Sequence, residues 1–490
     1  MTHFRLLAVV LLVLLGACEE PEATVRPNLI YVLADDLGWG EVGAYGQTKI
    51  RTPRLDRLAK EGLRFTQHYA GSAVCAPSRC VLLTGLHSGH CVIRDNDEMG
   101  HRGDVWNDPA LEGQRPLPED TVTLATLLKE AGYATGMMGK WGLGWAGSTG
   151  DPNAQGFDHY LSVLCQRVAH NHYPTHLWRD GEKVPLDNAF FKAHQKLPEG
   201  ADPNDPASYA AFLGKDYSMD RLTDDALAFV REHKEEPFFL YVPYLVPHVA
   251  IQVPEDALAE YAGAFEETPY VGGRGYLPHR TPRAGYAAMI TRMDRDIGRI
   301  VDLVDELGLG ERTLIVFSSD NGPSWVGGVD REYFESSGPF RGRKAQLYEG
   351  GIRVPMIARW TGTVASGGTT DHVSAFQDVL PTFVEAAGGA VPDGLDGISF
   401  LPTLRGDAEG QAQHEVLYWE HARRWQAVRA GRWKAVRKRP TQALELYDLV
   451  ADPHEKTDVA AANPDVALRM GRYLDSERTP SELFPLVADK

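Results

Sequence analysis

Three continuous apolar runs, each followed by polar residues, constrain the fold of this chain more than any other feature. They are Leu29–Ala34, Phe238–Tyr244 and Thr313–Phe317. Short runs without polar alternation are typical of strands that are buried on both faces, as in the parallel part of an α/β sheet. We therefore expect a large sheet with helices on both of its faces.

The segments between these runs predict the covering helices and the place of a site. Apolar residues recur at helical spacing from Tyr286 to Val304, and a second helix is predicted over Thr123–Ala131, ending before Gly132. The apolar stripe of the first helix indicates core packing. Because ligands bind beyond the carboxyl ends of strands in open α/β sheets, the polar residues after the three runs predict one shared site.

The pattern changes after residue 398. Short strand candidates separated by turns follow, and a helix comes near the end of the chain: Val416–Trp419, Gln426–Arg429, Trp433–Val436, Glu445–Asp448 and then Pro464–Ser476. We predict an α/β domain with a large mixed sheet over residues 24–398, and a smaller α+β domain with an antiparallel sheet over residues 399–490.

The N-terminus predicts export. Arg5 precedes the apolar run Leu6–Leu15, which is too short to span a bilayer and is typical of a signal peptide. Leu15-Gly16-Ala17-Cys18 resembles a bacterial lipoprotein box, so residues 1–18 would be a signal peptide and Cys18 would carry a lipid anchor. An ordinary secretory signal cleaved nearby is the alternative. We expect an exported protein, periplasmic or anchored in the outer membrane as a lipoprotein.

Charge excludes one class of partner. The net charge of −17 argues against nucleic-acid binding, which normally requires a basic surface. It does not exclude a small anionic substrate, because a local pocket can be basic in an acidic protein.

A cysteine stands at a predicted helix start. In the run Cys75-Ala76-Pro77-Ser78-Arg79, Pro77 suits a first helical turn. The unpaired N–H groups and the dipole at such a start favour an anion, and Arg79 one turn later would add donors. A buried structural cysteine is the alternative.

Two acidic pairs follow strands. Asp35-Asp36 comes after the first apolar run and Asp320-Asn321 after the third. Oxygen ligands of this kind suit a hard divalent cation, whereas a single such pair is more often a turn or a helix cap. Two pairs on one sheet, beside the cysteine run, favour a metal site.

With Thr84-Gly85, the cysteine run resembles the signature C-x-P-S-R-x-x-x-x-T-G of type I sulfatases, in the alkaline phosphatase superfamily. The resemblance extends from about Asn28 to the end of the chain. It implies that a formylglycine-generating enzyme oxidises Cys75 to formylglycine, whose hydrate is the nucleophile. It also implies a Ca²⁺ site, with Mg²⁺ as the alternative, formed by the modified Cys75 and by Asp35, Asp36, Asp320 and Asn321.

Further blocks resemble the same family and assign the remaining catalytic residues. Gly139-Lys140-Trp141 implies that Lys140 binds sulfate, and Pro247-His248 implies that His248 contacts the leaving group. The block Arg341-Gly342-Arg343-Lys344, followed by Glu349-Gly350-Gly351, implies that Lys344 is shared between sulfate and the leaving oxygen. Arg79 completes the predicted catalytic set, and Arg353 is expected to be structural.

One position departs from the family pattern. Gly142 stands where many relatives have the histidine assigned to sulfate release. The nearby stretch Gln166–Trp178 contains His170, His172 and His176, and one of them is a candidate for reaching the site. Surface positions are the alternative for all three.

The predicted activity is hydrolysis of sulfate esters, on sulfated carbohydrates, with aryl sulfates as artificial substrates. The alternatives are a phosphate or phosphonate ester hydrolase of the same superfamily, or a non-catalytic exported carbohydrate-binding lipoprotein. If Cys18 is lipidated and Cys75 modified, at most one disulfide forms among Cys80, Cys91 and Cys165.

Overall fold

A computed structural model describes residues 26–97, 112–273 and 275–487 of the chain. The predicted signal peptide and Cys18 lie outside these residues. Within them, no helix has both the length and the apolar composition needed to cross a membrane.

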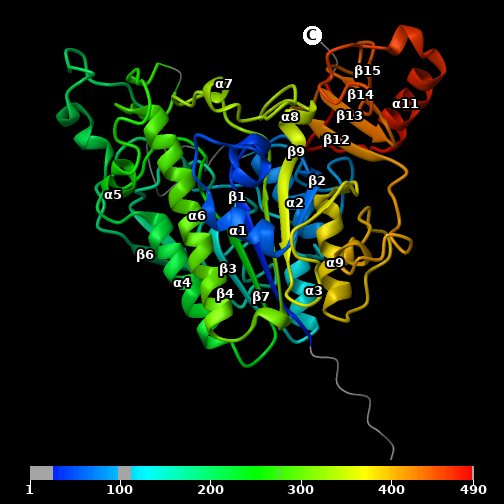
Figure 1. The fold of residues 1–490 in the computed structure, drawn as a ribbon, viewed down its shortest axis with the longest axis horizontal. Helices are drawn as coiled ribbons and strands as arrows, with labels where there is room; N and C mark the ends of the chain where they lie inside the picture. Colours follow the sequence, from blue (N-terminus) through cyan, green and yellow to red (C-terminus); the bar gives the residue numbers. More distant parts are fainter. Residues whose placement is uncertain (1–25, 98–111, 274, 488–490) are drawn as a thin grey trace, which may run out of the picture.

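A large mixed sheet forms the centre of the molecule, as predicted (Figure 1). Its strand order is β10-β2-β9-β8-β1-β7-β3-β4-β5-β6, and β11 pairs with β2. The central neighbours β8, β1, β7, β3 and β4 run parallel, whereas β9 and β5 are antiparallel to their neighbours. The strands are β1 (Asn28–Ala34), β2 (Leu63–Tyr69), β3 (Ala134–Lys140), β4 (His159–Val163), β5 (His176–Arg179), β6 (Glu182–Pro185), β7 (Phe238–Pro243), β8 (Thr313–Ser319), β9 (Arg353–Arg359), β10 (Gly368–Thr370) and β11 (Ser374–Ala375).

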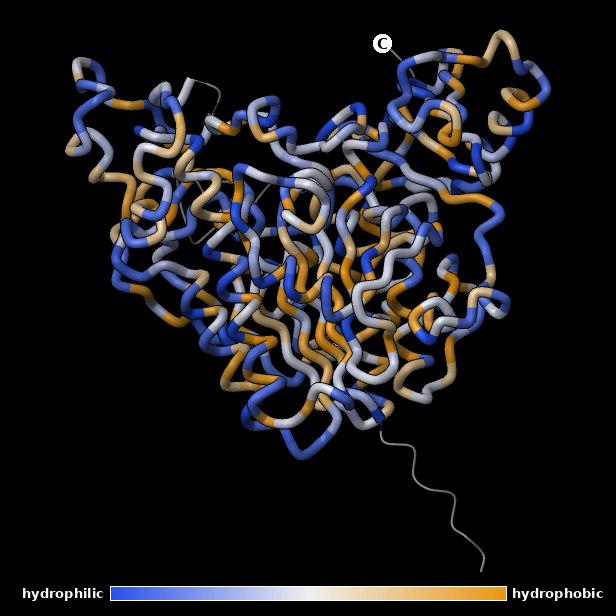
Figure 2. The backbone as a smooth tube through the Cα atoms, in the orientation of Figure 1, coloured by the Kyte–Doolittle hydropathy of each residue, from blue (hydrophilic) through white to orange (hydrophobic). Residues whose placement is uncertain are grey.

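Helices cover both faces of this sheet. Strand β1 shows why, because Ile30 and Val32 pack into one apolar core while Leu29 and Tyr31 pack into another on the opposite face. The buried strands appear as the orange centre of Figure 2. The helices are α1 (Pro53–Glu61), α2 (Cys75–Thr84), α3 (Leu124–Glu130), α4 (Ser218–Glu232), α5 (Glu255–Ala259), α6 (Pro282–Glu306), α7 (Arg331–Phe334), α8 (Glu349–Ile352), α9 (Val379–Ala386), α10 (Leu401–Leu404) and α11 (Pro464–Ser476). Of these, α1, α4 and α6 contribute to the first core, and α2, α3, α9 and α10 to the second.

The C-terminal part forms the predicted antiparallel sheet, at the upper right of Figure 1. Its order is β12 (Leu417–His421), β13 (Trp425–Ala430), β14 (Trp433–Arg437) and β15 (Glu445–Asp448), and α11 packs against one face. The other face shares an apolar cluster with Tyr69, Leu347 and Ile352 of the large domain. Leu401 and Leu404 of α10 pack into the core of the large domain, before this sheet begins. The division of the chain at residue 399 stays a prediction.

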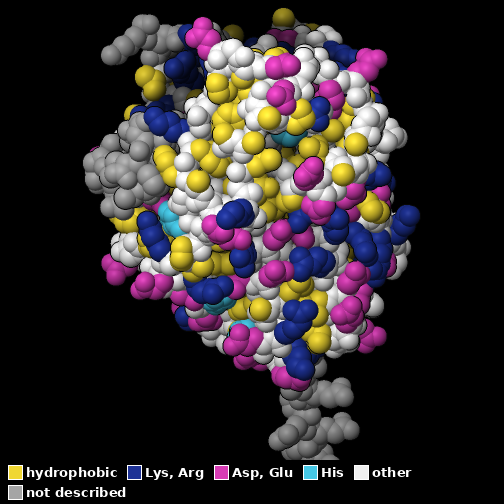
Figure 3. Space-filling view, turned by 90° about the vertical axis from the view of Figure 1, so that its left-hand side faces the viewer, with side chains coloured by type: hydrophobic (Ala, Val, Ile, Leu, Met, Phe, Trp, Pro, Cys, Tyr) yellow, Lys and Arg dark blue, Asp and Glu magenta, His cyan; other side chains and the backbone are white. Residues whose placement is uncertain are grey.

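Two long connections build a lobe at the upper left of Figure 1, between β6 and α4 and between α5 and α6. We call residues 186–217 and 260–281, without residue 274, the side lobe. On this side of the molecule, hydrophobic side chains gather in the upper half and charged ones in the lower half (Figure 3). Phe190, Leu213 and Val271 of the lobe are 47%, 52% and 44% exposed.

Candidate active site

The predicted nucleophile lies at the start of a helix, as its sequence indicates. Cys75 is the first residue of α2, and Gly85 ends the helix with a left-handed φ of 70°. The N–H of Ala76 donates to Asn96 Oδ1 at 3.0 Å, which satisfies one unpaired donor of the first turn. Cys75 is fully buried, and burial together with Asp35 raises the pKa of its thiol. The unmodified thiol is therefore a poor nucleophile.

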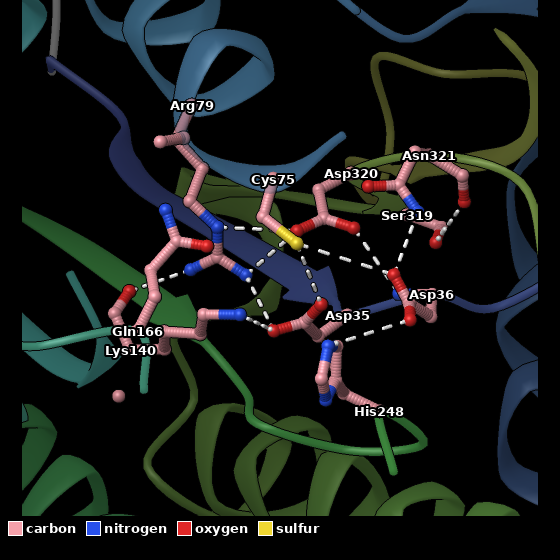
Figure 4. A network of polar contacts seen from close by, with 12 residues as sticks. Asp35, Asp36, Cys75, Arg79, Lys140, Gln166, His248, Ser319, Asp320 and Asn321 are labelled. Carbon is pink, nitrogen blue, oxygen red and sulfur yellow. Dashed lines mark hydrogen bonds and ion pairs between the residues drawn. The ribbon is translucent and has the colours of Figure 1, made fainter. Parts of the chain in front are cut away.

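The two acidic pairs meet beside this cysteine (Figure 4). Asp35 and Asp36 follow β1 and Asp320 and Asn321 follow β8, and these two strands are parallel neighbours. Cys75 Sγ lies 3.3 Å from Asp35 Oδ1 and 4.0 Å from Asp36 Oδ1. The N–H of Asp36 donates to Asp320 Oδ1 at 3.1 Å. The expected convergence at one edge of the sheet is confirmed.

Asn321 fits a metal site in a specific way. Its Nδ2 donates to Asp36 Oδ1 at 2.7 Å and to the carbonyl of Gly322 at 2.9 Å, which fixes the orientation of the amide. Its Oδ1 is buried without a hydrogen-bond partner in the described part of the chain. This unpaired amide oxygen and the three carboxylates beside it form a set of oxygen ligands that suits a hard divalent cation. One atom each of Asp35, Asp36, Cys75 and His248 also lies within 4.8 Å of the others.

Two buried cations, Arg79 and Lys140, and the partly buried Lys344 surround the carboxylates. Arg79 donates to Asp320 Oδ2 through Nε at 3.1 Å and Nη2 at 2.9 Å, and through Nη1 to the carbonyl of Lys140 at 2.5 Å. Lys140 Nζ lies 2.5 Å from Asp35 Oδ2. The loop carrying Lys344 is held by the N–H of Ala345, which donates to the carbonyl of Ala73 at 2.8 Å. Lys344 Nζ reaches Asp36 Oδ1 at 2.7 Å and Cys75 Sγ at 3.5 Å.

These charges set the protonation of the site. Burial raises the pKa of Asp35, but the charges of Lys140 and Arg79 outweigh it and hold that pKa well below its usual range. Burial lowers the pKa of Lys344, but Asp36 outweighs it and keeps the ammonium charged. Three carboxylates thus face three cations, so a bound divalent cation would leave the site positive and complementary to an anion.

His248 lies next to Asp35 and Asp36, below them in Figure 4, and is buried. It follows β7, a further parallel neighbour of β1, and its Nδ1 donates to the carbonyl of Val249 at 2.5 Å. Nε2 is therefore the nitrogen that faces Asp36, at 3.7 Å from Oδ2. Burial and Lys344 lower the pKa of this imidazole well below its usual value, so it is neutral before substrate binds.

The structure also shows what surrounds Gly142. Its φ of +87° is left-handed, and a Cβ there would lie 3.1 Å from Cγ and Nε2 of Gln166. Gln166 Nε2 donates to Asn96 Oδ1 at 3.4 Å. A glutamine amide thus occupies the space beside Gly142, and Gln166 and Asn96 were not predicted as site residues because neither belongs to a recognisable motif.

The three candidate histidines differ in how they contact His248. His170 stacks on His248, with ring centroids 5.0 Å apart and an interplanar angle of 16°. His172 Nε2 donates to the backbone carbonyl of His248 at 2.9 Å. His176 pairs with Glu112 at 2.6 Å and takes no part in this stack. As expected, Arg353 lies outside the site and donates to Thr66 O and Glu349.

Comparison with known proteins agrees with this geometry. Residues 27–390 match the sulfatase family, and residues 340–476 match a family described as N-sulphoglucosamine sulphohydrolase, C-terminal. The chain belongs to the sulfatase family. It is a sulfuric ester hydrolase with an alkaline-phosphatase-like fold.

Two curated sulfatases and a crystal structure illustrate the similarity. The chain is 32% identical to an N-acetylgalactosamine-6-O-sulfatase of Bacteroides thetaiotaomicron, over 94% of this chain and 95% of the relative. It is also 32% identical to human arylsulfatase A, over 94% and 83% of the two chains. The structure of Ps i-CgsB in complex with k-i-k-neocarrahexaose has a TM-score of 0.73 and 26% identity, and the match covers 93% and 94% of the chains.

The cysteines outside the site form no disulfide in the described residues. Cys80, Cys91 and Cys165 are all buried, and Cys91 Sγ donates to the carbonyl of Ile93 at 3.0 Å. The sequence left this point open.

Proposed function

We propose that this sulfatase removes sulfate from carbohydrates, using formylglycine at position 75 and a bound Ca²⁺. The observation that carries the mechanism is the placement of Cys75 between two cations and a carboxylate cage, with Lys344 Nζ 3.5 Å from Sγ. In the mature enzyme the hydrate oxygens of formylglycine would take the place of this sulfur. One hydroxyl of the hydrate attacks sulfur, and the other lets the group return to an aldehyde as sulfate leaves.

The side chains around Cys75 have distinct tasks in this proposal. Lys140 and Lys344 neutralise the non-bridging sulfate oxygens, because the neighbouring carboxylates raise the pKa of both ammonium groups and keep them charged. Lys344 or His248 Nε2 protects the leaving oxygen from departing as a bare anion. Arg79 does not touch the substrate; it holds Asp320 and the backbone of Lys140 in place.

Asp35, Asp36, Asp320 and Asn321 would hold the cation. When bound, it supplies charge neutralisation at the sulfate and at the nucleophile. We expect chelation with EDTA to abolish sulfate release and added Ca²⁺ to restore it. Restoration by Mg²⁺ to the same rate at equal free concentration would contradict the choice of Ca²⁺.

The nucleophile is tested by mass spectrometry of the peptide containing Cys75. A formylglycine-generating enzyme is the required partner, so co-expression with one should yield the aldehyde mass together with sulfate release. The Cys75→Ala variant should be inactive under the same conditions. Full activity of protein that carries only the thiol would exclude this mechanism.

Two relatives support a carbohydrate substrate. The Bacteroides relative is named for a 6-O-sulfated amino sugar, and the Ps i-CgsB structure holds a neocarrahexaose. Defined sulfated mono- and oligosaccharides, including galactose and N-acetylgalactosamine 6-sulfates, should be hydrolysed with a higher kcat/KM than 4-nitrophenyl sulfate. A higher kcat/KM for phosphodiesters than for any sulfate would favour the phosphoesterase alternative.

We further propose that the enzyme is an exported lipoprotein anchored through Cys18, with no nucleic-acid partner. The proposal rests on the lipoprotein box and the acidic net charge. Metabolic labelling with a clickable fatty acid should mark the wild type and not the Cys18→Ser variant. Release of unlabelled protein into the periplasm would support the ordinary signal peptide instead.

A further inference from the structure

Four rings from separate segments gather beside the predicted leaving-group histidine. We call His170, His194, His248 and Tyr276 the ring cluster. His170 follows β4, His248 follows β7, and His194 and Tyr276 come from the two connections of the side lobe. The His194 and Tyr276 ring centroids lie 4.4 Å apart, and the Tyr276 ring lies 5.0 Å from His170 and 5.8 Å from His248.

Hydrogen bonds fix the protonation of two of these rings. The backbone N–H of Tyr276 points at His194 Nδ1 at 3.3 Å, and because a backbone amide only donates, Nδ1 accepts. The proton of neutral His194 is therefore on Nε2, which lies 3.0 Å from His170 Nδ1. His170 Nδ1 accepts in turn, so neutral His170 carries its proton on Nε2. A backbone amide thereby determines the tautomer of a ring two steps away.

The backbone that starts this relay is unusual. Tyr276 has a left-handed φ of 62°, which non-glycine residues rarely adopt, and Gly275 before it has a φ of 79°. A Cβ at position 275 would lie 3.5 Å from His194 Nδ1. Strained backbone of this kind persists where the surrounding structure requires it, often at a ligand site.

The relay ends next to the reacting groups. The His170 ring lies almost parallel to His248, whose Nε2 is 3.7 Å from Asp36 Oδ2. Burial and the neighbouring Lys140 lower the pKa of His170 well below its usual value, so the ring stays neutral and its tautomer is defined. A leaving group bound at His248 therefore meets an oriented, uncharged imidazole at its side.

We propose that His170 contacts the sugar part of the substrate and that His194 positions it, so that this pair selects sugar sulfates over aryl sulfates. The inference rests on the proposed carbohydrate substrate. A sugar sulfate carries hydroxyl groups on its ring, of which the one at C4 lies nearest to the ester in a galactose 6-sulfate, and an oriented imidazole donor can bond to one of them. The ring of 4-nitrophenyl sulfate has no neighbouring hydroxyl, so it gains nothing from the same donor.

The test compares two substrates across a short series of variants. For His170→Ala and His194→Ala, kcat/KM for galactose 6-sulfate or N-acetylgalactosamine 6-sulfate should fall about tenfold or more, the size expected for one lost hydrogen bond. For 4-nitrophenyl sulfate, kcat/KM should change less than about threefold. His194→Gln can still donate an amide N–H to His170 and should recover part of the loss on the sugar.

Retained activity on 4-nitrophenyl sulfate shows that each variant is folded. His233→Gln, in a surface pair with Glu236, is the matched control and should leave both substrates unchanged. Equal losses on both substrates, or no loss on the sugar, would overturn the selective role while leaving the sulfatase assignment intact. A wild-type enzyme that hydrolyses aryl sulfates and no sugar sulfate would overturn the carbohydrate proposal and, with it, this inference.

Discussion

Lys434 and Glu349 form a fully buried ion pair, 2.9 Å from Nζ to Oε1, that joins the C-terminal sheet to the loop carrying Lys344. Lys434 belongs to β14, and Glu349 begins α8, five residues after Lys344. Glu455 completes the group, with Oε1 2.9 Å from the same ammonium and Oε2 accepting from the N–H of Glu349 at 2.6 Å. The C-terminal sheet therefore helps to position the loop that carries Lys344, and the buried charges lead to two predictions.

Lys434→Met should strongly destabilise the protein. It leaves Glu455 without its cation and Glu349 with Arg353 alone, and breaking a buried pair in this way typically costs about 3–5 kcal/mol. Thermal unfolding should show a clear drop in Tm. Lys438→Met is the matched control, because Lys438 is 37% exposed in its pair with Glu445 and exposed pairs contribute at most about 1 kcal/mol. Equal effects of the two substitutions would contradict this account.

The stability of the same group should depend on pH through Glu455. Burial raises its pKa from 4.5 to about 7, against the opposing charge of Lys434. Between about pH 4.5 and pH 7, Glu455 therefore keeps its proton in the folded state and has lost it in the unfolded state. Stability from this group is therefore complete below about pH 4.5 and is lost as the pH rises through about 7.

Glu455→Gln isolates this contribution, since the amide is a neutral isostere. The Tm of the wild type relative to this variant should fall between about pH 5 and pH 8. A difference in Tm that stays constant or increases over this interval would show that Glu455 is not protonated in the folded state.

The sequence predicted the sheet and the core of the site for a physical reason. Strands buried on both faces, such as β1 and β8, leave continuous apolar runs, and their carboxyl ends must meet at one edge. The apolar runs alone therefore place Asp35, Asp36, Asp320 and Asn321 together. The helix of Cys75 was equally clear, because Pro77 and Gly85 mark its two ends.

The surroundings of the site could not be predicted in the same way. His194 and Tyr276 come from long connections without periodicity, and only the fold brings them to His248. Gln166 could not be predicted as a site residue, because it fills the space left by the missing side chain at Gly142, which lies 24 positions earlier in the chain. Of the three candidate histidines, the sequence could not select His170, since stacking on His248 is a tertiary contact.

Arg79→Lys should impair catalysis although the charge is kept. The guanidinium bonds to Asp320 and to the carbonyl of Lys140 at once, and a lysine ammonium cannot reproduce that planar geometry. A loss of about 2–4 kcal/mol corresponds to about a 30- to 1000-fold lower kcat/KM for 4-nitrophenyl sulfate. Arg432→Lys, in an exposed pair with Asp448, should leave the rate unchanged. Wild-type activity of Arg79→Lys would show that charge alone suffices.

Asn321→Ala should weaken metal binding. The substitution removes the buried orphan Oδ1 and the 2.7 Å hydrogen bond that orients Asp36. We expect the Ca²⁺ affinity of EDTA-treated protein to fall about tenfold or more in calorimetric titrations, as for comparable losses at metal sites. Asn153→Ala, which affects a contact to the carbonyl of Phe157, serves as the control. An unchanged affinity would exclude Asn321 as a ligand.

Gly142→Ala should show why this chain carries no side chain at that position. The left-handed φ of +87° penalises any Cβ by about 1 kcal/mol, and contact with Gln166 at 3.1 Å adds a cost of similar size. Gly147→Ala is the matched control, because Gly147 has a φ of +77° with nothing within 4 Å, so only the backbone term applies. Gly142→Ala should therefore have a lower Tm than Gly147→Ala in thermal unfolding. In a Gln166→Ala background the contact is absent. There, Gly142→Ala should lower the Tm by less than it does in the wild type. If Gly142→Ala is no worse than Gly147→Ala, the Gln166 side chain moves aside freely, and the space beside Gly142 would accept the histidine of the family pattern.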